Sequence, residues 1–258
     1  MSSDVILRTE NLRREFGALV AVDDVTMQVQ AHTLHSIIGP NGAGKTTFFN
    51  LLSGNLQPTS GKVIFKEQDI TRFPMHKTVH LGIGRSFQIT NIFPNLSVLE
   101  NVRLAAQALG KDNFKLFSSN GRFSQYTDRA TQVLEQVGLS ARANDPARTL
   151  PHGDQRKLEL GMILAPDPEL LLLDEPTAGM ASEQVPELMA LIKAVQAAGD
   201  KTVMLVEHNM NVVMGASDMI TVMHQGAVLA EGTPDEIAHN EIVQQAYLGG
   251  LYEIGGES

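Results

Sequence analysis

Short apolar blocks separated by polar residues recur along the chain. The blocks Leu170–Leu173 and Val203–Val206 each consist of four consecutive apolar residues. Runs of this length without polar alternation are typical of parallel strands that are buried on both faces. We interpret Leu34–Ile38 as a third buried strand. Strands that alternate with helical segments predict an α/β protein with a parallel sheet.

The first third of the chain predicts a separate N-terminal sheet. Its strands are expected at Val5–Leu7 and Val20–Val29, and a turn rich in glycine and proline leads into a strand at Val63–Phe65. From about residue 90 to residue 161 the apolar spacing becomes helical, which predicts an inserted helical lobe. Within this lobe, residues 110–123 are polar and flanked by glycine, which favours a loop.

Two later segments carry helix-start signals. The pattern predicts a helix over Ser182–Ala198, capped by Ser182 and ended by Gly199. A shorter helix is predicted to open at Thr233, because Thr233 and Glu236 have the spacing of a capping box and a proline occupies the first helical position.

Composition limits the classes of function. The 258 residues suffice for one large domain, or for one domain with an inserted lobe. The net charge of −9 argues against nucleic-acid binding, because such proteins usually carry a basic stripe. The lack of cysteine excludes disulfides and thiolate chemistry. No signal peptide is expected at the start, and no apolar run approaches the roughly 18–20 residues that span a bilayer.

The stretch SIIGPNGAGKTTFFN contains a phosphate-binding pattern between a strand and a helix. Its spacing fits G-x-x-x-x-G-K-[ST], and in this context we expect a nucleotide site rather than a ligand-free glycine-rich turn. Successive N–H groups and the positive helix N-terminus would hold phosphates, with Lys45 at the β- and γ-phosphates and the Thr46 hydroxyl on Mg²⁺. The predicted nucleotide-binding residues are Gly39, Pro40, Asn41, Gly42, Ala43, Gly44, Lys45, Thr46 and Thr47.

Two adjacent carboxylates, Asp174 and Glu175, follow the apolar run in ELLLLDEPTAG. Ligands of open α/β sheets bind at the carboxyl ends of the strands, where this pair is placed. We expect Asp174 to hold Mg²⁺ through its water shell, and Glu175 to orient and deprotonate a water that attacks the γ-phosphate. A merely solvated strand end is the alternative.

These motifs, together with several others in the same order, resemble the ATP-binding cassette family, the motor subunits of ABC transporters. RSFQ ends in Gln88 at the position of the family's Q-loop glutamine, and LVEHN contains His208 at the position of its switch histidine. Phe16 matches the aromatic residue that stacks on adenine. LPHGDQRKLELG, which begins at Leu150, lies where the family has its signature sequence. The resemblance covers essentially the whole chain.

The resemblance implies the cofactors ATP and Mg²⁺ and a set of catalytic roles. Glu175 and His208 would act in hydrolysis together with Gln88 and Lys45, while Thr46, Gln88 and Asp174 would serve the metal. It also implies that two cassettes enclose two ATP molecules head to tail. The residues lent across such a dimer would be Leu150, Pro151, His152, Gly153 and Asp154.

The signature departs from the family pattern Leu-Ser-Gly-Gly-Gln. Pro151 replaces the serine, so its hydroxyl donor is absent, and Ala181 lies where the family usually has an aspartate. One hypothesis is that the two ATP sites are unequal in a heterodimer with a more regular cassette. The other is that these residues are tolerated variants without functional asymmetry.

The C-terminal half and FQITNIFPNLSVLENVRLAA resemble the ATP-binding subunits of branched-chain amino-acid importers. This resemblance implies an ATPase that powers uptake of branched-chain amino acids, other amino acids, urea or short amides. Its partners would be a second cassette (a paralogue or another copy), two transmembrane permeases and, indirectly, an extracytoplasmic solute-binding protein. It would be peripheral at the cytoplasmic face of the bacterial inner membrane. An exporter motor and a soluble non-transport ATPase are the alternatives.

The expected fold is therefore a single ABC ATPase domain over residues 1–258. A RecA-like parallel sheet of the P-loop NTPase type would carry an N-terminal antiparallel subdomain. The helical subdomain is expected at about 89–161 and ends in the signature motif. A helical tail is expected at about 233–258, packed on the core or against a partner cassette.

Overall fold

Two sheets organise the protein. The computed structural model describes residues 5–86, 92–108, 110, 121–198 and 200–252. The larger sheet has the strand order β10-β9-β3-β8-β7-β6, in which β10 is antiparallel to β9 and the other pairs are parallel. Its strands are β3 (Leu34–Ile38), β6 (Ile83–Arg85), β7 (Leu170–Asp174), β8 (Thr202–Val206), β9 (Met219–His224) and β10 (Ala227–Gly232).

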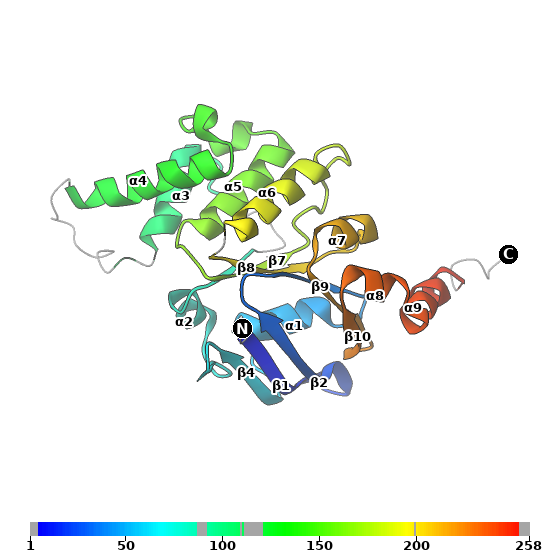
Figure 1. Ribbon diagram of the computed structural model, residues 1–258. Coiled ribbons are helices and arrows are strands. Elements are labelled where there is room, and N and C mark those ends of the chain that lie inside the picture. Colours follow the sequence, from blue (N-terminus) through cyan, green and yellow to red (C-terminus); the bar gives the residue numbers. More distant parts are fainter. Residues whose placement is uncertain (1–4, 87–91, 109, 111–120, 199, 253–258) are drawn as a thin grey trace.

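The smaller sheet is antiparallel, with the order β2-β1-β4-β5. It packs with helix α1 (Lys45–Leu52) against one face of the larger sheet, and Figure 1 shows α1 between the two sheets. The predicted arrangement of a parallel core with an N-terminal antiparallel subdomain is confirmed. The strands are β1 (Val5–Phe16), β2 (Leu19–Gln30), β4 (Ser60–Phe65) and β5 (Gln68–Asp69).

Strand β7 explains why its sequence lacks polar alternation. Leu170 and Leu172 pack into the core that contains α1, whereas Leu171 and Leu173 pack into the core formed with the helices of the opposite face. Because side chains alternate along a strand, a layer on each face requires an apolar residue at every position. The same alternation continues to Asp174, which is therefore directed to the α1 face.

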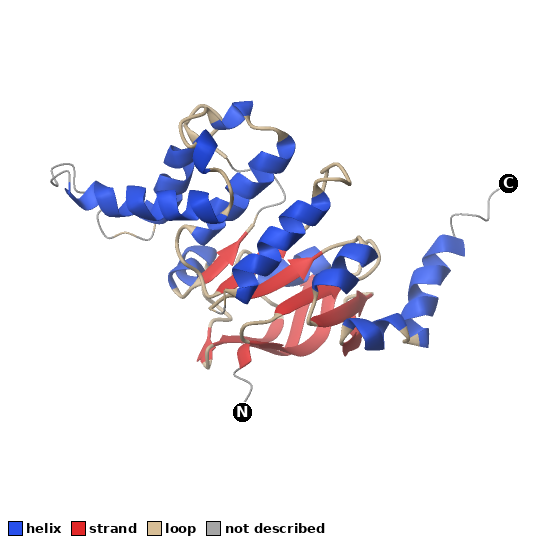
Figure 2. Ribbon diagram, turned by 45° about the horizontal axis from the view of Figure 1, so that its top comes forward, coloured by secondary structure: helices blue, strands red, loops and turns tan. Residues whose placement is uncertain are grey.

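Helices cover the other face of the larger sheet and extend it into a lobe (Figure 1 and Figure 2). The lobe is the predicted helical insertion, and α9 lies at the opposite end of the molecule. The remaining helices are α2 (Met75–His80), α3 (Val98–Gln107), α4 (Gly121–Gln136), α5 (His152–Leu164), α6 (Val185–Ala197), α7 (Met210–Ala216), α8 (Pro234–Ala238) and α9 (Glu241–Tyr252), with 3₁₀ turns at Ser140–Arg142 and Ala147–Thr149.

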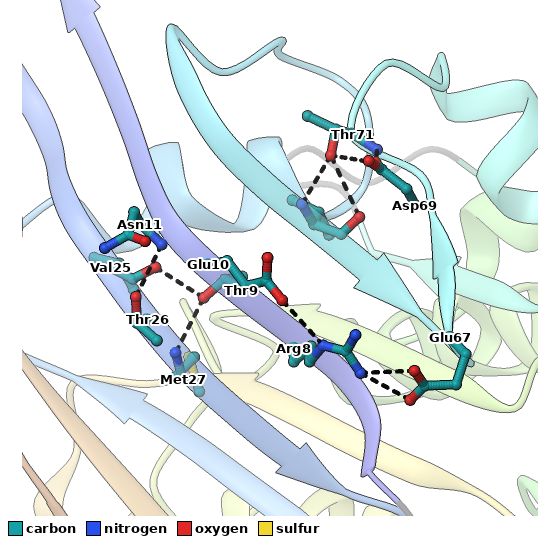
Figure 3. A network of polar contacts seen from close by, with 11 residues as sticks. Arg8, Thr9, Glu10, Asn11, Val25, Thr26, Met27, Glu67, Asp69 and Thr71 are labelled. Carbon is teal, nitrogen blue, oxygen red and sulfur yellow. Dashed lines mark hydrogen bonds and ion pairs between the residues drawn. The ribbon is translucent and has the colours of Figure 1, made fainter.

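Strand β1 is much longer than the predicted Val5–Leu7. A bulge interrupts its pairing with β2 between Thr9 and Leu12, and Asn11 adopts a positive φ of 47°. Side chains replace the lost ladder bonds, as Figure 3 shows: the Thr9 hydroxyl donates to the Val25 carbonyl at 2.9 Å, and the Asn11 N–H donates to the Thr26 hydroxyl at 2.8 Å. The bulge and the mainly polar residues after Leu7 obscure the strand's alternation in the sequence.

Helix α6 does not begin where the sequence predicted. Its N-cap is Gln184 rather than Ser182, and no side chain caps it. Pro186 accounts for the later start, because a proline is tolerated in the first turn of a helix but clashes with the carbonyl four residues earlier when it lies deeper. If the helix were capped at Ser182, the carbonyl four residues before Pro186 would be that of Ser182, and the proline ring would clash with it.

The other helical expectations are largely confirmed. Thr233 and Glu236 form the predicted capping box at the start of α8. The predicted loop over residues 110–123 is wrong at its end, because α4 already begins at Gly121; extending a helix costs little once it is nucleated. Helix α5 continues past residue 161 to Leu164. The limits of the helical subdomain at about 89–161 stay a prediction. Within the described residues, no helix has both the length and the apolar character needed to cross a membrane.

Candidate nucleotide site

The strand order brings three loops together. Strands β3, β8 and β7 are neighbours and run parallel, so their carboxyl ends lie at one edge of the sheet. The phosphate-binding pattern follows β3, His208 follows β8, and the Asp174–Glu175 pair ends β7. Segments more than 100 residues apart in sequence therefore form one site.

The predicted phosphate loop is closely packed against its surroundings. A Cβ atom on Gly39 would lie 2.2 Å from the Met223 carbonyl oxygen, and one on Gly44 would lie 2.3 Å from that of Ala21. Both glycines also have positive φ, 154° and 95°. Real Cβ atoms do not approach backbone oxygens this closely, so the fold requires glycine at both positions.

Lys45 is held inside this loop. Its ammonium donates to the carbonyls of Gly39 at 2.7 Å and Pro40 at 3.0 Å. Burial lowers the pKa of Lys45, while the nearby Glu175 and Asp174 oppose this effect. The loop thus presents a partly desolvated cation, which suits a phosphate ligand.

Asp174 is a buried carboxylate whose two oxygens both lack a hydrogen-bond partner. Burial raises its pKa, and the guanidinium of Arg85, 3.7 Å from its Oδ2 atom, partly opposes the rise. An orphaned buried carboxylate directed to the α1 face fits a cation that is shared with ligand phosphates. The chemistry of Asp174 and Thr46 therefore fits Mg²⁺.

Glu175 and His208 are in direct contact. Glu175 adopts φ 50°, which turns the chain at the end of β7, and its Oε1 lies 2.5 Å from His208 Nε2. The strand-end turn allows adjacent Asp174 and Glu175 to serve the same site. A carboxylate and an imidazole at this distance can exchange a proton or orient one another.

Sequence reasoning missed two residues that organise this site. Glu207 is buried, and its carboxylate binds Thr177 and the His208 N–H. Arg85 donates to Ser53 Oγ at 2.5 Å and to the Phe49 carbonyl at 3.3 Å beside Asp174. A charged residue at the end of an apolar strand was the available signal for both.

Of the other predicted residues, all but Gln88 can be placed. Phe16 ends β1 with 43% of its surface exposed. Gln88 lies outside the described residues. Leu150 and Pro151 precede α5, whose first residues are His152, Gly153 and Asp154. These five signature residues adjoin the loop after Glu175, where a Cβ on Gly153 would lie 3.1 Å from Gln184 Oε1.

The fold and the site define a P-loop nucleotide-binding protein with an inserted helical lobe. Residues 22–178 match the protein family described as ABC transporter, and residues 227–252 match the one described as Branched-chain amino acid ATP-binding cassette transporter. The chain belongs to the ABC transporter family. This confirms the resemblance that the sequence motifs indicated.

Individual relatives extend over nearly the whole chain. The high-affinity branched-chain amino acid transport ATP-binding protein LivG of Salmonella typhimurium is 40% identical over 252 residues, which is 96% of this chain and 99% of the relative. The corresponding protein BraF of Pseudomonas aeruginosa is 39% identical over 249 residues, with 95% and 98% covered. A crystal structure of a nucleotide-free ATP-binding cassette from an ABC transporter has a TM-score of 0.81 at 28% identity, covering 95% of this chain and 99% of that one.

Proposed function

We propose that this chain is the ATP-binding and ATP-hydrolysing subunit of an ABC importer for branched-chain amino acids or a related small polar solute. The observation that carries the proposal is the double match along the chain. The ABC transporter match ends at residue 178, and the branched-chain match begins only at residue 227. Two separate parts of the chain thus support the motor function and the transporter type.

The chain's own residues supply the steps of hydrolysis. The loop over residues 39–47 binds the phosphates, and Lys45 neutralises charge on them. Thr46 and Asp174, with Gln88, would hold Mg²⁺, which would supply charge stabilisation at the γ-phosphate. Glu175 accepts the proton of the attacking water, and His208 donates a hydrogen bond to the γ-phosphate.

Communication with permeases is assigned to the entry of the helical lobe. Phe93 and Leu96 are exposed by 51% and 37% in the segment before α3, so they offer apolar surface to a partner. Asn101 of α3 fixes the backbone of this segment, since its side chain accepts a hydrogen bond from the N–H of Phe93 and donates one to the carbonyl of Phe93. ATP binding closes two cassettes, and the lobe transmits the movement.

The proposed assembly contains a second cassette, either a paralogue or another copy of this chain, and two transmembrane permeases. A solute-binding protein outside the cytoplasm would act through the permeases, so no residue of this chain is expected to touch the solute. We place the chain peripherally at the cytoplasmic face of a bacterial inner membrane, without a nucleic-acid partner. The similarity to LivG and BraF, which are branched-chain amino acid transport ATP-binding proteins, supports this arrangement.

An exporter motor is less well supported. The lipopolysaccharide export system ATP-binding protein LptB of Acidithiobacillus ferridurans is 31% identical over 249 residues. This identity is below the 35–40% of the branched-chain amino-acid relatives over nearly the same length. The importer therefore remains the better proposal.

Purification of the complex from gently solubilised native membranes tests the assembly. We expect mass spectrometry to identify two hydrophobic permeases, a second cassette and a binding protein for amino acids or amides. Recovery of the chain from the soluble fraction alone, or with export machinery, would contradict the importer. Solute specificity can then be measured directly on the binding protein.

Catalysis is tested on the same complex with Glu175→Gln. Loss of the general base should lower ATP turnover by at least about 100-fold while ATP binding persists. Glu135→Gln is a matched control, because Glu135 is exposed on α4 in the helical lobe. Turnover of Glu175→Gln within a few-fold of the control would show that another residue is the base.

A further inference from the structure

The aromatic ring of Phe16 carries a cation on one face. The guanidinium carbon of Arg14 lies 4.5 Å from the centre of the ring. An arginine at this distance is attracted by the negative face of the aromatic π-system. Since 43% of Phe16 remains exposed, the ring still has surface available for a ligand.

Other contacts fix the side chain and the backbone of Arg14. Its Nη1 donates to the carbonyl of Gln57 at 2.9 Å, and its backbone pairs with Val22 within the β1–β2 sheet. Gln57 belongs to the segment between α1 and β4, so the guanidinium is held between the chain that follows the phosphate-loop helix and the ring. This anchoring restricts the orientation of Phe16 before any ligand arrives.

The β1–β2 hairpin also places Phe16 near the phosphate loop. Phe16 pairs with Leu19 at the hairpin tip, and Ala21 follows two residues later on β2. The Ala21 carbonyl is the group that a Cβ on Gly44 would approach to 2.3 Å. Two residues of strand span roughly 7 Å, so the ring lies within reach of a nucleotide whose phosphates occupy the loop.

We infer that Arg14 is a positioning residue for the nucleobase: it holds Phe16 from one face so that the other face receives the purine ring. The inference rests on the proposed nucleotide binding and deepens it. A fixed platform reduces the ordering cost of binding. The cation also draws electron density from the phenyl ring, which favours stacking with an electron-rich purine.

The test compares ligands with and without a base on the full chain. Arg14→Met keeps the length of the side chain but removes its charge. Calorimetry with Mg²⁺ should give an ATP affinity reduced by about 3- to 10-fold in this variant. Affinity for inorganic tripolyphosphate, which has no base to stack, should be unchanged. Arg13→Met is the matched control, because Arg13 is the neighbouring arginine of β1 and pairs with Glu15 instead.

Tryptophan fluorescence provides a second readout. The chain contains no tryptophan, so Phe16→Trp introduces a single reporter at the platform. ATP should quench this reporter, whereas tripolyphosphate should not. Adding Arg14→Met to the Phe16→Trp chain should shift the ATP titration to higher concentration, and adding Arg14→Lys should shift it less.

Several outcomes would overturn the inference. Equal ATP affinity in Arg14→Met and the unaltered chain excludes a role for Arg14. An equal loss for ATP and tripolyphosphate means that Arg14 acts through folding or the phosphate loop, not the base. A third outcome is that the unaltered chain binds tripolyphosphate and ATP with equal affinity and that ATP does not quench Phe16→Trp. In that case Phe16 does not stack on the base, while the proposed phosphate binding is retained. Binding of neither ligand overturns the proposed nucleotide site as well.

Discussion

Glu207 binds Thr177 twice, through the backbone N–H at 3.0 Å and the hydroxyl at 2.6 Å, both on the same carboxylate oxygen. The other oxygen accepts the N–H of His208 at 3.2 Å. One buried side chain at the end of β8 therefore fixes both the turn that carries Glu175 and the backbone of His208. We propose that Glu207 is a positioning residue, which would act on hydrolysis through Glu175 and His208.

The first prediction concerns Glu207→Gln. The amide nitrogen of glutamine is a donor, so it cannot accept the backbone N–H of His208 or, in the other orientation of the amide, that of Thr177. Charge-assisted hydrogen bonds of this kind are worth about 1.5–3 kcal/mol, so we expect kcat for ATP to fall by roughly 10-fold or more with KM within about 3-fold. Steady-state kinetics of the assembled complex measure both constants.

Two threonine variants separate this role from general stability. Thr177→Ser retains both donors and should keep nearly full turnover. Thr177→Val keeps only the N–H donor, so its turnover should lie between that of Thr177→Ser and that of Glu207→Gln. If the turnover of Thr177→Ser were as low as that of Glu207→Gln, the two hydrogen bonds from Thr177 to Glu207 would not explain the loss of turnover. A raised KM with unchanged kcat would assign Glu207 to binding instead.

The second prediction concerns the orphaned carboxylate of Asp174. Its ionised form is disfavoured by burial more than it is favoured by Arg85, as the raised pKa indicates. Replacing it by asparagine removes a buried charge but also the counter-charge of the buried Arg85, so the two effects oppose each other and the Tm of the nucleotide-free Asp174→Asn chain should change little. The same change should abolish the extra stabilisation that Mg²⁺ adds to that by ATP. Thermal unfolding without nucleotide, with ATP plus EDTA, and with ATP plus Mg²⁺ checks both effects; an unaltered Mg²⁺ increment would exclude Asp174 from the metal site.

The third prediction concerns the pH dependence of stability through His35. This histidine is 1% exposed, and burial lowers its pKa to about 4. Its Nε2 lies 2.7 Å from the Thr221 hydroxyl, which itself donates to Glu231, so the His35 Nε2–H is the donor. The lowered pKa keeps the ring neutral at pH values well above 4. The unfolded chain, with a pKa near 6.5, takes up the proton more readily than the folded one. The free energy of unfolding should therefore rise with pH between about 4 and 6.5, by up to about 3 kcal/mol.

His35→Gln should flatten this slope, because glutamine retains a donor for Thr221 but does not titrate. His76→Gln is the control, since His76 is exposed on α2. Urea unfolding at pH 4.5, 5.5 and 6.5 measures the slopes. Parallel slopes in the unaltered chain and His35→Gln would show that other groups carry the dependence.

The sequence was most informative where one local property determines the structure. Strands β3 and β7 were placed to within one residue, because burial on both faces leaves no polar position in the central run of β7. The phosphate loop was found because its glycines, lysine and threonine have a fixed spacing within residues 39–46. Both features can be recognised from residues close together in the chain, although the contact that requires glycine at position 44 comes from the distant Ala21.

The sequence was least informative where distant segments meet. Glu207 and Arg85 have roles only because β8 lies between β3 and β7, and because β6 is the neighbour of β7. Neither adjacency can be obtained from local periodicity. Ser182 was a plausible cap by residue type, but the position of Pro186 decided the helix start.

The last prediction concerns the altered signature. Pro151 is the N-cap of α5 with φ −56° and ψ 156°, close to the −65° and 160° of Ser97, which caps α3 through its hydroxyl. A serine therefore fits this backbone, and its capping gain of about 1 kcal/mol is offset by the 0.4–1 kcal/mol of unfolded-state restriction that proline provides. Tm should change little in Pro151→Ser, so a change in turnover can be assigned to the ATP site rather than to folding.

If the two ATP sites of the assembled complex are unequal, Pro151→Ser combined with Ala181→Asp should raise the ATP turnover of the complex severalfold. The control is Pro146→Ser, which should not raise it, because Pro146 is an exposed proline before a 3₁₀ turn. Unchanged turnover in the double variant would favour the alternative, that proline and alanine are tolerated here without asymmetry.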